Sequence, residues 1–126
     1  MEIKLRLEDA LSAHKVLGTI IDNTELKIDV LLKFRLLSLK TYISPIVSNF
    51  EIVKNEKIIE YGKENKDGIF QILPSDKTAV NKYTKALKET MDSTVTVVTE
   101  KIKPGEIFNK GITSDYLEVL LPFIGE

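Results

Sequence analysis

The chain has 126 residues, a size typical of one domain, so we expect a single domain over residues 1–126. Its 18 basic and 19 acidic residues give a net charge of −1, which argues against a general nucleic-acid binder or a protein held on a membrane by charge. The absence of cysteine excludes disulfides and thiolate chemistry, and no apolar run is long enough for a transmembrane helix.

The N-terminal segment predicts a short strand followed by a helix. Ile3, Leu5 and Leu7 alternate with charged residues, which is the period-two pattern of a strand. Glu8 and Asp9 suit the positive end of a helix dipole. The segment lacks the long apolar stretch of a signal peptide, so we expect a cytoplasmic protein. The apolar stripe of the predicted helix includes Ala10, His14, Leu17 and Ile21.

A heptad pattern predicts one long helix from about Leu26 to Tyr61, with Asn23 or Thr24 as its N-cap. Pro45 removes a backbone hydrogen bond and predicts a kink. The apolar spacing continues in register through this proline, so we expect one kinked helix rather than two helices. The residues of this seam are Leu32, Leu36, Leu39, Ile43, Ile46, Phe50 and Val53.

The predicted helix is long for a domain of this size. Residues 26–61 would span roughly 50 Å as a helix, whereas a compact domain of this length is about 35–40 Å across. Either the kink folds the helix back, or its end projects with Phe50, Val53 and Ile58 exposed. A projecting apolar end requires a partner, so we expect a homo-oligomer.

The second half of the sequence predicts shorter elements. Gly62 is expected to end the long helix in a left-handed C-cap, and Asp67-Gly68 is typical of a hairpin turn. The order predicts an α+β fold: a helical hairpin with one long Pro-kinked helix, packed beside a short sheet of two or three strands. The expected elements are a strand at 69–73, a helix at 75–91 capped by Ser75, a strand at 94–102, and a helix from Thr113 or Ser114 to Pro122.

The sequence contains no catalytic or metal-binding motif. His14, the single histidine, lies beside an apolar stripe and has no orienting partner in the pattern, so we interpret it as structural. Glu56 and Glu60 lie among lysines, which indicates a solvated ion-pair surface rather than a metal site. Glycine-rich phosphate loops and nucleophile motifs are absent. We therefore expect a non-enzymatic protein without a cofactor or metal.

Basic and aromatic residues on the long helix are candidates for ligand binding. Lys33, Arg35 and Lys40 lie near the seam and are interleaved with Phe34 and Tyr42. A planar guanidinium suits a phosphate. We hypothesise that these cations bind a small anionic ligand.

Arg35 has a second interpretation, which the sequence leaves open. An arginine among apolar neighbours needs a partner, and an internal salt bridge to Asp29 or Asp22 would satisfy it without a ligand. Tyr61 and Lys63 at the end of the helix complete the candidate set, because the tyrosine ring could stack on a base. Tyr61 as a packed aromatic residue is the alternative.

The sequence resembles a group of small proteins of tailed phages and prophages. The resemblance rests on Phe34-Arg35, on Pro45, on FEIVKNEKIIEYGKENKDG at residues 50–68 and on LLPFI at residues 120–124. It covers roughly residues 26–124 and includes the order strand, helix, β-branched strand and C-terminal helix.

This resemblance implies a non-enzymatic phage accessory protein in the cytoplasm of a bacterial host. Such proteins include counter-defence sponges that sequester nucleotide immune signals, and adaptors or assembly chaperones that bind virion proteins. With the basic residues of the long helix, we hypothesise a homo-oligomeric sponge for a nucleotide-like ligand. The alternative is an adaptor or chaperone that binds another protein.

Overall fold

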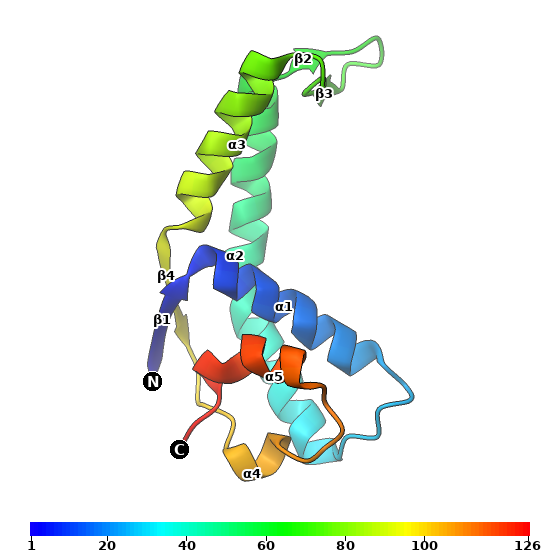
Figure 1. Ribbon diagram of the computed structural model, residues 1–126, viewed down its shortest axis with the longest axis vertical. Helices are drawn as coiled ribbons and strands as arrows, with labels where there is room; N and C mark the ends of the chain where they lie inside the picture. The colour runs from blue at the N-terminus through cyan, green and yellow to red at the C-terminus, as the bar shows by residue number, and fades with distance from the viewer. The chain divides into compact units, whose positions relative to one another are not determined.

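The computed structural model describes residues 1–126 and has an α+β fold (Figure 1). The chain forms two compact units: residues 1–47 with 94–126, and residues 48–93. The long helix α2 (Val30–Tyr61) contributes its first part to the first unit and its second part to the second. None of the helices combines the length and apolar character needed to cross a membrane.

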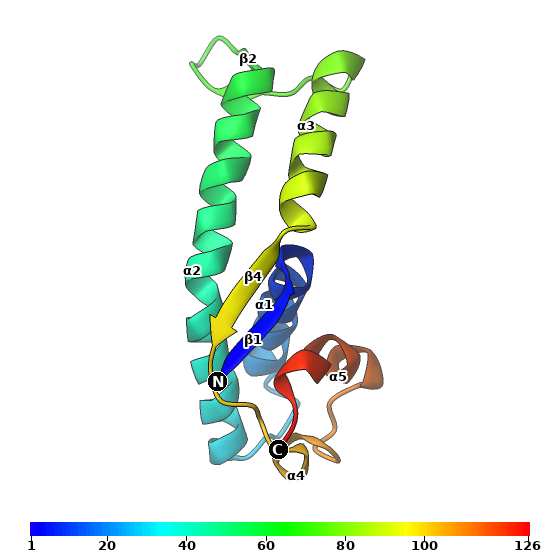
Figure 2. The same ribbon diagram turned by 90° about the vertical axis from the view of Figure 1, so that its left-hand side faces the viewer.

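The first unit contains a two-stranded antiparallel sheet of β1 (Glu2–Arg6) and β4 (Thr94–Val98), which lie side by side in Figure 2. Ile3 is opposite Val97, and both side chains are buried. The predicted alternation of both strands is therefore confirmed. The predicted strand at 94–102 ends early at Val98, and Ile102 instead forms an isolated parallel bridge with Ile124.

Helices cover the sheet of the first unit. Helix α1 (Leu7–Asp22) contacts α5 (Ser114–Leu120). The C-terminal region also contains the short helix α4 (Pro104–Ile107) and the 3-10 turn η1 (Leu121–Phe123). The predicted seam of α2 is confirmed in this unit. The core contains Ala10, Ala13, Leu17, Ile20, Leu32, Leu36, Leu39, Ile43, Val97, Ile107, Leu120 and Phe123.

Helix α2 begins later than predicted. Its backbone is helical only from Val30, because the Asp29 carboxylate accepts a hydrogen bond from the Leu32 amide at 2.8 Å and so caps the first turn. The prediction of Asn23 or Thr24 as the cap is therefore wrong. The helix is continuous through Pro45, as the seam predicts.

The second unit is a helical hairpin. The last part of α2 is followed by β2 (Lys63–Glu64), β3 (Phe70–Gln71) and α3 (Lys77–Met91), and the two strands pair antiparallel. Gly68 has a φ of 78°, which only glycine adopts readily, so the predicted turn is confirmed. The Asn65 side chain accepts hydrogen bonds from the amides of Asp67 and Ile69 within this turn.

Two predicted caps of the second unit are wrong. Gly62 does not have a left-handed backbone; glycine is needed there because a Cβ would lie 2.4 Å from the Ile58 carbonyl oxygen. Asp76, not Ser75, caps α3, since its carboxylate accepts a hydrogen bond from the Ala79 amide at 3.1 Å.

The second part of α2 is accompanied by α3 within the same unit, as Figures 1 and 2 both show. Phe50 is buried, and Val53 and Ile58 are half-buried, whereas Ile52 and Ile59 are exposed. Burial of Phe50 therefore does not require a second copy of the chain.

Candidate functional site

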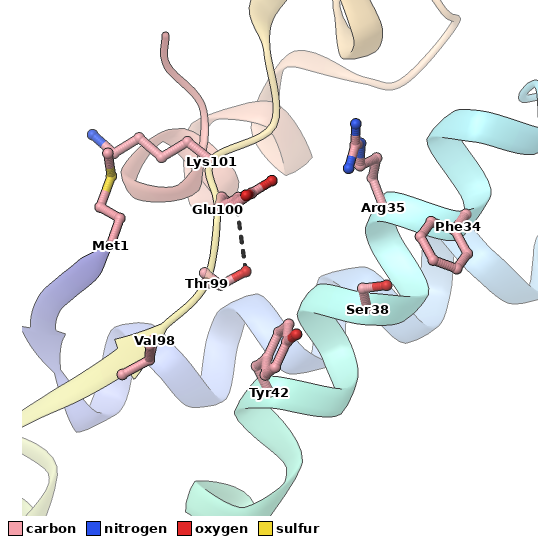
Figure 3. Close-up of a pocket in the computed structure, with 9 residues that line it drawn as sticks. All are labelled: Met1, Phe34, Arg35, Ser38, Tyr42, Val98, Thr99, Glu100 and Lys101. Carbon is pink, nitrogen blue, oxygen red and sulfur yellow. Dashed lines mark hydrogen bonds between the residues drawn. The ribbon is translucent and has the colours of Figure 1, made fainter.

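A groove in the first unit brings the candidate residue Arg35 together with exposed apolar side chains. It lies between α2 and the end of β4 with the residues that follow, and its volume is about 420 Å³ (Figure 3). We call it the α2–β4 groove. It is lined by Met1, Phe34, Arg35, Ser38, Tyr42, Val98, Thr99, Glu100 and Lys101.

Both walls of the α2–β4 groove carry exposed apolar side chains beside polar ones. Phe34, Ser38 and Tyr42 follow each other at intervals of one helical turn, so they line one face of α2. Phe34 is 61% exposed and Tyr42 is 54% exposed; Val98 on the opposite wall is 60% exposed. Large apolar side chains with this exposure on both walls of a cavity indicate a binding surface.

Arg35 and Glu106 form an ion pair beside the groove. The Arg35 Nε donates a hydrogen bond to the Glu106 carboxylate at 3.1 Å, and the two side chains are 39% and 17% exposed. Figure 3 shows Arg35 and Glu100 at the same end of the groove. The internal salt bridge considered in the sequence therefore exists, but the predicted acidic partners are wrong.

The carboxylate of Asp29 pairs with Lys110 at 3.2 Å. The hydrogen bond from the Leu32 amide, followed by this ion pair, lowers the pKa of Asp29 below its usual value. The Asp29 carboxylate is therefore engaged at the start of α2. The ion-pair partner of Arg35 is instead Glu106, a residue of α4.

The other two candidate lysines of α2 do not line the groove. Lys33 is exposed. The half-buried Lys40 lies against α1, with its Nζ 3.5 Å from the position that a Cβ on Gly18 would occupy. Successive residues of a helix turn by about 100°, so Lys33 and Lys40, which are seven residues apart, lie near the same face of α2, whereas Arg35 lies on a different face. The three cations therefore do not form one site.

Tyr61 and Lys63 belong to the second unit. Lys63 is an exposed residue of β2. Tyr61 is half-buried and has the Lys57 Nζ 5.8 Å from its ring centroid, a cation–π distance. It also borders a surface hollow of about 380 Å³ with Lys82 and Lys85. The predicted five-residue ligand set is thus divided between the units, and Arg35 alone of the set lines the α2–β4 groove.

His14 has a structural partner. Its Nε2 lies 3.2 Å from the Ser44 hydroxyl, and that hydroxyl donates to the Lys40 carbonyl at 2.7 Å. Burial and the nearby Lys40 charge lower the pKa of His14. Since the Ser44 proton is engaged with a backbone carbonyl, this pair is not arranged as an activated nucleophile. Nor does any cluster of three or more His, Cys, Asp or Glu side chains form a potential metal site.

Sequence reasoning missed the second wall of the groove and the partner of Arg35. The alternation at 94–102 correctly indicated a strand, but no local pattern indicates which helix lies opposite Val98 and Glu100. Glu106 follows Pro104-Gly105 in a segment that carries no periodicity. Only the tertiary fold shows that Glu106 pairs with Arg35 and that Val98 and Glu100 line the same groove.

No protein family, curated protein or solved structure matches the chain in the three comparisons with known proteins.

Proposed function

We propose that the protein is a non-enzymatic, phage-type accessory protein that binds a small anionic ligand with an aromatic part in the α2–β4 groove. A nucleotide immune signal has this chemistry, and its sequestration in the bacterial cytoplasm constitutes counter-defence. The observation that supports the proposal is the position of Arg35, whose guanidinium pairs with Glu106 and which lines the same groove as the exposed aromatic residues Phe34 and Tyr42.

Arg35 has hydrogen-bonding capacity beyond the ion pair. Its Nε is used by Glu106, whereas the terminal nitrogens carry further N–H donors in a planar fork. Such a fork binds a phosphate or carboxylate through parallel hydrogen bonds. The ion pair with Glu106 fixes the orientation of the guanidinium before a ligand arrives, which reduces the entropy lost on binding.

The remainder of the groove suits an aromatic ligand portion. Phe34 and Tyr42 offer ring faces for stacking, and stacking on one base contributes about 1–3 kcal/mol in proteins that bind single strands. The cavity of about 420 Å³ lies within the usual range of small-molecule sites.

The test is native mass spectrometry of the purified protein with a pool of cyclic nucleotides and ADP-ribose-derived nucleotides, followed by calorimetry on any ligand found. We expect Arg35→Gln combined with Glu106→Gln to weaken binding about 10- to 100-fold, because a charged hydrogen bond is lost while the packing is kept. Lys33→Ala is the matched control, since it removes an exposed cation of the same helix turn that does not line the groove. No mass gain from any nucleotide, or equal affinity of the double variant, contradicts the proposal.

A second candidate function is an adaptor or assembly chaperone for another phage protein. The exposure of Met1, Phe34, Tyr42 and Val98 favours it, because these four exposed apolar side chains line the same groove. It predicts no binding of small molecules and a defined complex with a co-expressed virion protein in native mass spectrometry. Phe34→Ala would weaken that complex, whereas Lys33→Ala would leave it unchanged.

A further inference from the structure

Strand β4 has a free edge. Only β1 pairs with it, and the Thr99 amide donates to the Met1 carbonyl at 3.0 Å just beyond the strand. Bonded and non-bonded residues alternate in an antiparallel pair. The residues at even positions, Thr94, Thr96 and Val98, therefore direct their backbone N–H and C=O groups away from β1.

This edge lacks the features that keep an edge strand from pairing. Residues 93–99 include no charged residue, proline or glycine, and Thr94, Thr96 and Val98 are exposed. Edge strands that remain single usually carry charges or proline. The neighbouring β1 does carry charges, namely Glu2, Lys4 and Arg6. The contrast within one sheet identifies β4 as the edge suited to a further strand.

We propose that a second copy of the chain pairs with this edge, β4 against β4 in antiparallel orientation, to form a symmetric dimer. Full overlap of the strand places Thr96 opposite Thr96 of the partner subunit, and Thr94 opposite Val98 of the partner subunit. A two-fold symmetric contact requires a surface that complements itself. The β4 edge is such a self-complementary surface. It carries no charge that would face its own copy, and pairs of β-branched residues across two strands are favourable.

The dimer would also cover exposed apolar surface at Val98. Val98 belongs both to the β4 edge and to the lining of the α2–β4 groove. A partner subunit on the edge therefore borders the groove and removes apolar surface from water there. The dimer goes beyond the proposed function and does not depend on the identity of the ligand.

The test uses opposite charges at the centre of the strand. In Thr96→Glu the new carboxylate faces Lys4 of the same chain, which favours the fold, but faces its own copy across the dimer. We expect light scattering and native mass spectrometry to show a dimer for the unmodified protein and a monomer for Thr96→Glu or Thr96→Lys alone. An equal mixture of the two variants should form a heterodimer, because the facing charges are then opposite.

Lys4→Thr, on the outer face of β1, is the control and should remain dimeric. Circular dichroism should show that each Thr96 variant keeps its fold. Even if one variant does not, a heterodimer in the mixture still shows that position 96 of one chain contacts position 96 of the other. An unmodified protein that stays monomeric, or a Thr96→Glu variant that stays dimeric, overturns the proposal. A monomer that binds a nucleotide overturns the dimer alone, and a dimer that binds none in the pool contradicts only the proposed function.

Discussion

The two units of the chain bury apolar side chains to different extents. In residues 48–93 the buried hydrophobic residues are Phe50 and Ala79, whereas all the others lie in the first unit. The core of the first unit contains residues from both of its strands and from helices near each end of the chain. The second unit relies on a tight hairpin, on capping and on ion pairs such as Lys57–Glu60 at 2.8 Å. The difference indicates that packing stabilises one unit and local backbone interactions stabilise the other.

The two units are expected to differ in their dynamics. A segment of about 46 residues buries little apolar surface by itself, and exposed ion pairs contribute only about 0–1 kcal/mol each. We therefore expect amide hydrogens of the second unit to exchange through local opening, and those of the first-unit core to exchange only in global unfolding.

The largest loss of stability is expected from the first-unit core. Leu36 is 0% exposed, whereas its neighbour Leu37 is 44% exposed. Leu36→Ala should lower the free energy of unfolding by about 2–5 kcal/mol, because it removes buried methyl groups and leaves a cavity. Leu37→Ala, the matched control, should change it by less than about 0.5 kcal/mol. Denaturant unfolding followed by circular dichroism measures both, and similar losses for the two variants would contradict the assignment of the core.

The next largest loss of stability is expected in the second unit. A Cβ at Gly62 would lie 2.4 Å from the Ile58 carbonyl oxygen and 2.6 Å from that of Gln71, so the backbone must shift. Gly62→Ala should destabilise the hairpin by about 1–3 kcal/mol. Hydrogen exchange should accelerate in residues 48–93 and remain unchanged in the first-unit core. Gly105→Ala is the control, because nothing lies within 4 Å of its Cβ position; exchange accelerated throughout the chain would show that the units do not open separately.

A smaller effect should distinguish the observed cap of α3 from the one predicted by sequence. Asp76→Ala removes the acceptor of the Ala79 amide and should cost about 1 kcal/mol of second-unit stability. Ser75→Ala should cost almost nothing. Asp76→Asn keeps an acceptor oxygen and should restore most of the loss in hydrogen-exchange protection. A larger loss of second-unit stability for Ser75→Ala than for Asp76→Ala would show that Ser75, as predicted from the sequence, caps α3.

Local patterns predicted the elements because their periodicity follows from backbone geometry. The seam from Leu32 to Ile43 indicated the buried face of α2, and Asp67-Gly68 indicated the hairpin, since each depends on neighbours in the chain. The caps failed because several adjacent residues, such as Ser75 and Asp76, have suitable side chains. Only backbone geometry decides which one accepts the bond.

The candidate site was predicted less well because it depends on distant residues. Arg35 and Glu106 are 71 positions apart, and the walls of the α2–β4 groove come from α2 and from residues 98–101. A basic and aromatic composition identified Arg35 with its neighbours Phe34 and Tyr42. It could not indicate that Lys40 lies against α1 or that Tyr61 belongs to another unit.

The smallest expected effect is a pH dependence confined to the first unit. Burial and the charge of Lys40 lower the pKa of His14 below its ordinary value of 6.5, so the folded protein takes up this proton less readily than the unfolded chain. The contribution of neutral His14 to the free energy of unfolding is fully present above pH 6.5, and it is lost as the pH falls below this value towards the folded-state pKa. His14→Gln removes the titrating group and can keep a hydrogen bond to Ser44. Melting temperatures measured from about pH 8 to about pH 5 should therefore fall more steeply for the unmodified protein than for the variant. Parallel curves would show that His14 titrates alike in both states, and that the contact between α1 and α2 at Ser44 is insensitive to its charge.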